Sequence, residues 1–159
     1  MSESNNQKIE ELRLLFEREN NRKQNLENKA SYFLGIISII TTIICAFSNQ
    51  IKLIPQINNY FGILILITLI ISFSMSIILF ISIFLPRDYY HPFDIKDIEK
   101  LEKSFKVENE QFNENLFDQY FVSIYTNCEI NDKLVVNLKY AIYFFICFIF
   151  MIILNVVII

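Results

Sequence analysis

The chain has 159 residues, of which 53% are hydrophobic and 15% aromatic, and its formal net charge at pH 7 is −3. This apolar content is too high for a soluble domain with an ordinary surface and is typical of a small protein with several membrane spans. Only two glycines occur, which excludes glycine-rich phosphate loops and dinucleotide fingerprints. The weakly acidic balance excludes a global basic field for nucleic acid.

The first part of the chain predicts one long helix that leads into a first membrane span. Residues 1–7 are polar and carry no pattern, whereas apolar residues recur at helical spacing from Lys8, and no Gly or Pro precedes Gly35. Residues 1–29 alternate in charge, which is typical of a solvated helix or of a cytoplasmic stalk touching partner subunits or lipid headgroups. Residues 30–49 are the first predicted span, because they contain an uncharged apolar run.

The second predicted span is Tyr60–Leu85, which contains no charged residue. As a helix it would be roughly 39 Å long at about 1.5 Å per residue. A bilayer hydrocarbon core is about 30 Å thick, so this segment is long enough to cross with some tilt. Residues 50–59, which include Pro55, are the predicted external loop between the two spans, and Pro86 is expected to end the second one.

Residues 86–139 are the second polar region and are predicted to be helical and cytoplasmic. A short amphipathic helix is expected first, on the apolar stripe formed by Ile95, Ile98, Leu101 and Phe105. A second helix is expected from near Glu110, with an apolar face over Phe112–Cys128 and a local break near Asn127–Asp132. Residues 140–159 are the third predicted span.

The distribution of Lys and Arg predicts the orientation of the spans. Six lie in residues 1–29, one lies in residues 50–59, and seven lie in residues 86–139. Because cytoplasmic loops are enriched in these residues, the N-terminus and the second polar region are expected inside and the C-terminus outside. The sequence therefore predicts an all-α membrane protein with three transmembrane helices and a helical cytoplasmic region.

Small polar side chains lie on one face of each of the first two predicted spans. They are Ser38, Thr41, Thr42 and Cys45 in the first span, and Thr68, Ser72 and Ser76 in the second. Such side chains either pack helices closely in lipid or line a pore, and the sequence leaves both interpretations open. The spans contain no ionisable acid or base, which weighs against ion-coupled transport.

No constellation of residues indicates an enzyme. Catalysis needs converging nucleophiles, acids, bases or metal ligands. The single histidine is His91, no recognised catalytic motif occurs, and the three cysteines have neither zinc nor disulfide spacing. We therefore expect a non-enzymatic protein without a metal or a cofactor.

Two short segments carry a resemblance to a known group of proteins. They are Asn25–Gly35, around the letters ENKAS, and Asn127–Ala141, around N…INDK…LKYA. Together with the order of charged helix, span hairpin, cytoplasmic helices and last span, they resemble small transmembrane effectors of prokaryotic antiphage systems, of the Pycsar and CBASS type. The resemblance implies a homo-oligomer of the prokaryotic inner membrane that forms a gated pore, or disrupts the membrane, when a nucleotide signal appears.

The resemblance also implies partners and candidate contacts. The expected partners are membrane lipid, further copies of the chain, and a nucleotide messenger or the protein of the same operon that makes or senses it. Because nucleotides are anionic, their contacts would fall to cytoplasmic cations near the membrane. These candidates are Arg18, Arg22, Lys23, Lys29, Arg87, Lys96, Lys100 and Lys133. The alternative is a membrane scaffold that binds a soluble partner through the Phe112–Cys128 face.

Overall fold

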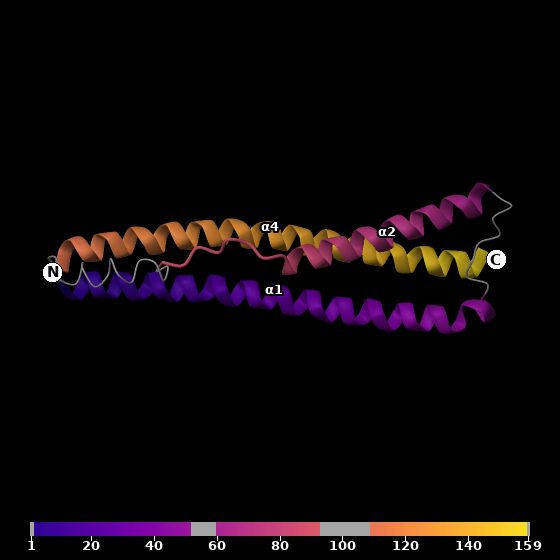
Figure 1. Ribbon diagram of the computed structural model, residues 1–159, viewed down its shortest axis with the longest axis horizontal. Helices are drawn as coiled ribbons and strands as arrows, with labels where there is room; N and C mark the ends of the chain where they lie inside the picture. The colour runs from indigo at the N-terminus through magenta and orange to yellow at the C-terminus, as the bar shows by residue number, and fades with distance from the viewer. Residues whose placement is uncertain (1, 52–59, 93–108, 159) are drawn as a thin grey trace. The chain divides into compact units, whose positions relative to one another are not determined.

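The computed structural model describes residues 2–51, 60–92 and 109–158, and all regular secondary structure within them is helical (Figure 1). The helices are α1 (Ser2–Ile51), α2 (Tyr60–Phe84) and α4 (Asn109–Ile158). The predicted all-α class is therefore confirmed. The short amphipathic helix predicted over residues 95–105 lies outside the described residues.

Two predicted helix limits are wrong. Helix α1 begins at Ser2 and not at Lys8, because residues 2–7 contain no Gly or Pro that would stop a helix. Helix α4 continues through Asn127–Asp132 without the predicted break. The side chains of Asn127 and Asn131 are fully buried and bond to other segments, so they do not compete for the hydrogen bonds of their own helix.

The chain divides into two compact units, and both α1 and α4 contribute residues to each. The first unit, here called the polar unit, consists of Met1–Asn25 and Pro86–Lys133. The second, here called the span unit, consists of Leu26–Leu85 and Leu134–Ile159.

In the polar unit, α1 and α4 pack in parallel, and the segment 86–92 joins them. The ring centroids of Phe16 and Tyr120 lie 6.0 Å apart, and Arg22 contacts Asp132 further along both helices. Pro86 follows the end of α2 because proline cannot continue the helix, and the amide of Tyr89 then donates to the carbonyl of Arg87 at 2.8 Å. The segment 86–92 thus runs as non-helical chain against two helices.

In the span unit, α4 presents a regular row of buried residues to its neighbours. Leu134, Leu138, Ala141, Phe145 and Phe148 are buried at alternating spacings of four and three, which is the pattern of a packed helix pair. Helix α2 runs antiparallel to α4. This follows because Ser76 bonds to Ala141, while the Phe73 ring lies 4.9 Å from the Phe148 ring, between centroids, near the other end of the row.

Helix α1 completes the span unit with the aromatic ring of Phe33 and with three buried apolar residues, Leu26, Ala30 and Ile37. The Phe33 ring lies 5.5 Å from Phe80 on α2 and 6.5 Å from Phe145 on α4. Ala30 on α1 and Ala141 on α4 are completely buried. Small side chains at these positions let helix backbones approach closely, which is the usual basis of helix packing in lipid.

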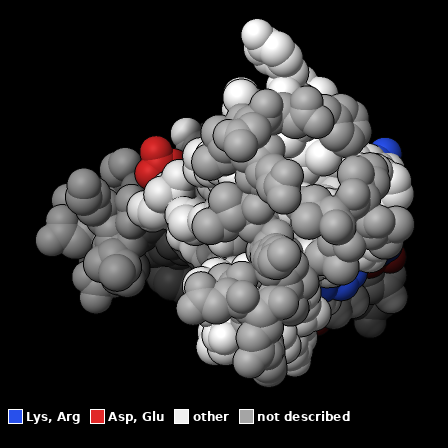
Figure 2. All heavy atoms as spheres, turned by 90° about the vertical axis from the view of Figure 1, so that its right-hand side faces the viewer, with Lys and Arg blue, Asp and Glu red and all other residues white. Residues whose placement is uncertain are grey.

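The outer surface of the span unit is apolar. Large apolar side chains that are more than half accessible there include Ile39, Ile43, Leu64, Ile70 and Phe150. Figure 2 looks onto the end where α2 begins, and few of the described atoms facing the viewer belong to charged residues. Three helices are long and apolar enough to cross a membrane, over Gln7–Ala46, Gly62–Phe84 and Asn115–Asn155. Such a surface is stable in lipid and not in water, so the chain is a membrane protein.

Candidate functional site

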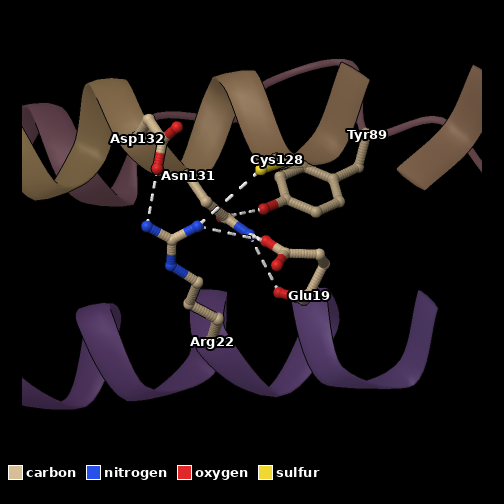
Figure 3. Close-up of polar contacts among 6 residues, drawn as sticks. All are labelled: Glu19, Arg22, Tyr89, Cys128, Asn131 and Asp132. Carbon is tan, nitrogen blue, oxygen red and sulfur yellow. Dashed lines mark hydrogen bonds and ion pairs between the residues drawn. The ribbon is translucent and has the colours of Figure 1, made fainter. Parts of the chain in front are cut away.

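The polar unit is held together by a cluster of polar side chains around Arg22, here called the Arg22 cluster: Glu19, Arg22, Tyr89, Cys128, Asn131 and Asp132 (Figure 3). Arg22 points from α1 toward α4. Its Nη2 atom donates to Asp132 Oδ1 at 2.6 Å, and its Nη1 atom lies 3.4 Å from Glu19 Oε2 and 4.0 Å from Cys128 Sγ. The hydrogen bond to Asp132, with the charge of Glu19, raises the pKa of Arg22 above its ordinary value. The cluster therefore holds a permanently charged guanidinium between two carboxylates.

Asn131 is the buried centre of the Arg22 cluster. Its Nδ2 atom donates to Glu19 at both the main-chain oxygen, at 2.9 Å, and Oε2, at 2.8 Å. Its Oδ1 atom accepts a hydrogen bond from the hydroxyl of Tyr89. One asparagine side chain thus links α1, α4 and the segment 86–92.

Further contacts fix the segment 86–92 on the two helices. Asn127 accepts from the amide of Tyr90 at 3.1 Å and donates to its carbonyl at 2.9 Å, which satisfies both polar ends of a fully buried side chain. The ammonium of Lys23 lies 4.1 Å from the centre of the Tyr89 ring. The ring of His91 packs edge-on against Phe16, at 6.0 Å between centroids. The segment is therefore held by both amide bonds and ring contacts.

The hydroxyl groups of α1 in the span unit bond to their own helix. Ser38, Thr41 and Thr42 each donate to the carbonyl four residues earlier, at 2.8–2.9 Å. Ser38, Thr42 and Cys45 are exposed at the surface of the unit, and Thr41 is half-buried. These side chains form a polar strip on a helix face that is largely exposed among the described residues.

The hydroxyl groups of α2 lie differently, because two of them are buried inside the chain. Ser72 and Ser76 are 2% and 1% exposed. Ser76 donates to the carbonyl of Ala141 at 3.0 Å, whereas Thr68 and Ser72 bond within α2. Further along the same two helices, Asn137 on α4 donates to Ser82 at 3.0 Å. Ser76 and Ser82 thus join α2 to α4.

Comparison with known proteins identifies the family. Residues 12–159 match the family described as the Pycsar effector protein domain. The chain belongs to the Pycsar effector family. Neither the curated proteins nor the solved structures gave a match. The predicted resemblance is therefore confirmed, and this Pycsar effector is a membrane effector of antiphage defence.

The structure brings few of the candidate gating cations of this Pycsar effector together. In the polar unit, Arg22 and Lys23 belong to the contacts around Tyr89, whereas Lys133 pairs with Glu129 of its own helix at 2.9 Å. Arg18 is exposed and Arg87 is half-buried. Lys29 is an exposed residue of the span unit, and Lys96 and Lys100 lie outside the described residues.

Sequence reasoning missed the buried asparagines of the Pycsar effector. Asn127 and Asn131 were interpreted as a helix break, although their spacing of four residues places them on one helix face. Glu19 and Arg22 are three residues apart on α1 and therefore also share one helix face. Their spacing was the corresponding signal for a polar contact on α1. Within the described residues, no group of three or more His, Cys, Asp or Glu side chains is arranged to hold a metal ion.

Proposed function

We propose that this Pycsar effector assembles from several copies and forms a gated pore in the prokaryotic inner membrane, or disrupts that membrane. A nucleotide signal or a partner protein from the same operon controls it, and no catalytic step is involved. The family match supports the setting, and the packing of the span unit supports the need for several copies.

The observation that carries the proposal is the closed interior of the span unit. Rings of Phe33, Phe80 and Phe145 meet between the three helices, and Ala30, Phe80 and Ala141 are completely buried. An interior filled in this way leaves no room for a water path through one chain. Ions would therefore pass between copies, or through lipid that the assembled copies disturb.

The polar strip of α1 is the best candidate lining for such a path. Ser38, Thr42 and Cys45 are exposed on an otherwise apolar span unit, so each copy has the same polar strip to turn toward a common axis. Ser72 and Ser76 are buried between helices of one copy, and we assign them to helix packing instead.

The Arg22 cluster is the best candidate for control by an anionic signal. A phosphate group would compete with Asp132 and Glu19 for the guanidinium of Arg22, because arginine binds carboxylate and phosphate with the same planar geometry. Loss of these two contacts would loosen α1 from α4 in the polar unit. Both helices also contribute residues to the span unit, so a displacement of either helix in the polar unit acts on the span unit through the continuous chain.

Ion flux from liposomes containing the purified full-length chain tests the pore. The double variant with leucine at Ser38 and Thr42 should lower the ion flux of the activated protein at least about tenfold. Leucine removes the hydroxyl groups that hold water along the polar strip, and its apolar side chain is favourable in lipid. Ile39→Leu, an apolar exchange at an exposed α1 position, is the matched control and should leave the flux unchanged. Unchanged flux for Ser38→Leu/Thr42→Leu in an intact assembly would remove this strip from the path.

A second candidate function is a membrane scaffold that binds a soluble partner through the Phe112–Cys128 face. The described members of this face, which are Leu116, Tyr120, Ile124, Asn127 and Cys128, are half-buried or buried. The neighbouring side chains Phe117, Phe121 and Tyr125 are 39%, 59% and 68% exposed, and they would make the contact with such a partner. A scaffold would give no flux in liposomes under any condition and would remain a single copy in the membrane.

A further inference from the structure

The polar unit exposes large apolar side chains on both of its helices. Leu14 and Leu15 on α1 are 56% and 44% exposed. On α4, the apolar row Phe117, Phe121 and Tyr125 continues at four-residue spacing, with Val122 beside it. These residues belong to the polar unit, which the distribution of Lys and Arg predicts to be cytoplasmic. With that topology, contact with lipid does not explain their exposure.

The segment 86–92 leaves these side chains uncovered. It contacts α1 at Phe16 and Lys23 and α4 at Asn127 and Asn131. At about 100° per residue, Leu14 and Arg18 lie on the opposite side of α1 from Phe16 and Lys23. Phe121 and Tyr125 are likewise turned well away from Asn127 on α4. Both helices thus present an apolar face that the described chain does not use.

The two faces lie at the same height along the helix pair. Phe16 contacts Tyr120, and Arg22 contacts Cys128 and Asp132. Leu14, Leu15 and Arg18 are therefore level with the stretch of α4 that contains Phe121, Val122 and Tyr125. Copies of one protein in the same membrane are related by an axis along the membrane normal, so side chains at the same height meet.

Charge decides which face meets which. Arg18 lies between Leu14 and Leu15 on the α1 face, and among the described residues it forms no ion pair. Near the level of Arg18, the α4 face offers the Tyr125 ring and the exposed carboxylate of Glu129, one oxygen of which also pairs with Lys133 of the same helix. An α1–α1 contact would set Arg18 against Arg18, and an α4–α4 contact would set Asp118 and Glu129 against their own copies. Only the contact between α1 and α4 brings opposite charge and a cation–aromatic pair together.

We propose that the Leu14/Leu15/Arg18 face of α1 docks against the Phe121/Val122/Tyr125 face of α4 in a second copy of this chain. This contact rests on the proposed function in one respect, since it supplies the assembly that a pore between copies requires. Its existence does not depend on ion flux, and it is tested separately.

Cysteine cross-linking between two differently tagged copies tests the pairing in the full-length chain, in membranes. Cys45, Cys128 and Cys147 are first replaced by alanine, and one copy then carries Leu14→Cys and the other Tyr125→Cys. The mixed pair should cross-link at least about tenfold faster than Leu14→Cys with itself or Tyr125→Cys with itself, because only the mixed pair is in contact. Equal rates for the three combinations would overturn the proposal.

Reversal of charge tests the same contact without new cysteines. Arg18→Glu should weaken self-association in nanodiscs at least about tenfold, which corresponds to about 1.4 kcal/mol, since it opposes Glu129 of the next copy. The double variant Arg18→Glu/Glu129→Arg should recover the association. Arg13→Glu is the matched control, because it makes the same charge change on another side of α1 and should have little effect.

The possible results separate this contact from the pore. Mixed cross-links without ion flux would support the contact and contradict the proposed function. Normal flux and normal association in Arg18→Glu would overturn the contact and leave the pore in place. A chain that remains a single copy at all concentrations would overturn the contact and leave these faces to a soluble partner.

Discussion

At the scale of single residues, burial decides which polar contacts matter in this Pycsar effector. The two partners of Arg13 on α1 are more than half exposed, as is Arg13 itself. Arg22 is 35% exposed and bonds to Glu19, which is 14% exposed, and to Asp132 on another helix, which is 63% exposed. Solvent screens the contacts of Arg13 and the Arg22–Asp132 pair strongly and the Arg22–Glu19 pair less.

Arg22→Ala should therefore destabilise the folded chain by about 1 kcal/mol, at the upper end for partly exposed ion pairs. Arg13→Ala, which removes an exposed arginine from the same helix, should leave the stability nearly unchanged. Thermal unfolding of both variants in detergent compares them directly. Equal effects would contradict a special role for the Arg22 cluster.

The raised pKa of Arg22 has a definite consequence for pH dependence. A base whose pKa is raised on folding contributes stability at all pH values below its unfolded pKa and loses it only as pH rises through the folded pKa. For arginine both values lie far above neutrality. The contribution of the guanidinium should thus be constant between about pH 7 and 9, and thermal unfolding of the native chain and of Arg22→Ala should differ by the same amount at both.

Asn131 should matter more than Arg22, because it is completely buried. Asn131→Ala removes the hydrogen bond from the Tyr89 hydroxyl and those to the main-chain oxygen and side chain of Glu19, and each lost hydrogen bond costs about 0.5–1.5 kcal/mol. Asn115→Ala, at an exposed position of the same helix, is the control and should be nearly neutral. Faster hydrogen exchange around Tyr89 in Asn131→Ala alone would support this, and identical exchange in both variants would refute it.

At the scale of elements, the sequence predicted the spans well and the helix continuity poorly. Tyr60–Leu85 was predicted and Tyr60–Phe84 is observed, because an uncharged apolar run of this length has no other stable form. The uninterrupted α4 was not predictable from local preference, since Asn127 and Asn131 favour turns unless distant partners satisfy them. Those partners lie on α1 and on the segment 86–92, about which local sequence patterns carry no information.

The packing of α2 against α4 gives a prediction at this scale. Ser76→Leu places a large side chain where Ser76 reaches the backbone of Ala141, so it should separate the helices and lower the yield of folded protein. Ser38→Leu makes the same exchange at an exposed position of α1 and should leave the fold intact. Size-exclusion profiles of the two variants in one detergent provide the measurement. Normal folding of Ser76→Leu would mean that α2 and α4 do not approach closely.

At the scale of the whole molecule, the candidate site was only partly predictable. Charge bias and the need of a pore for polar lining drew attention to α1 and to its arginines, of which Arg22 lies in the Arg22 cluster. The pairing of Arg22 with Asp132, 110 positions apart in sequence, depends on the packing of α1 against α4 and has no local signature. The burial of Ser72 and Ser76 is likewise a property of the assembled helices, since their spacing alone fits a pore and a packed interface equally well.

The order of the helices and the distribution of charges predict an orientation of the Pycsar effector in its membrane. In the span unit α2 runs antiparallel to α4, as expected when successive spans cross in opposite directions. With six Lys and Arg in residues 1–29, seven in residues 86–139 and one in residues 50–59, the first two regions should be cytoplasmic. Reporter fusions after Gln7, within residues 56–59 and after Ile159 test this, with cytoplasmic signal expected only from the first. A fusion after Glu110 is the internal control and should report the same side as Gln7, because residues 86–139 and the N-terminus are predicted to share it. Cytoplasmic signal from the fusion after Ile159 would contradict three crossings, and it would require that one of the three apolar helices lies in the membrane without spanning it.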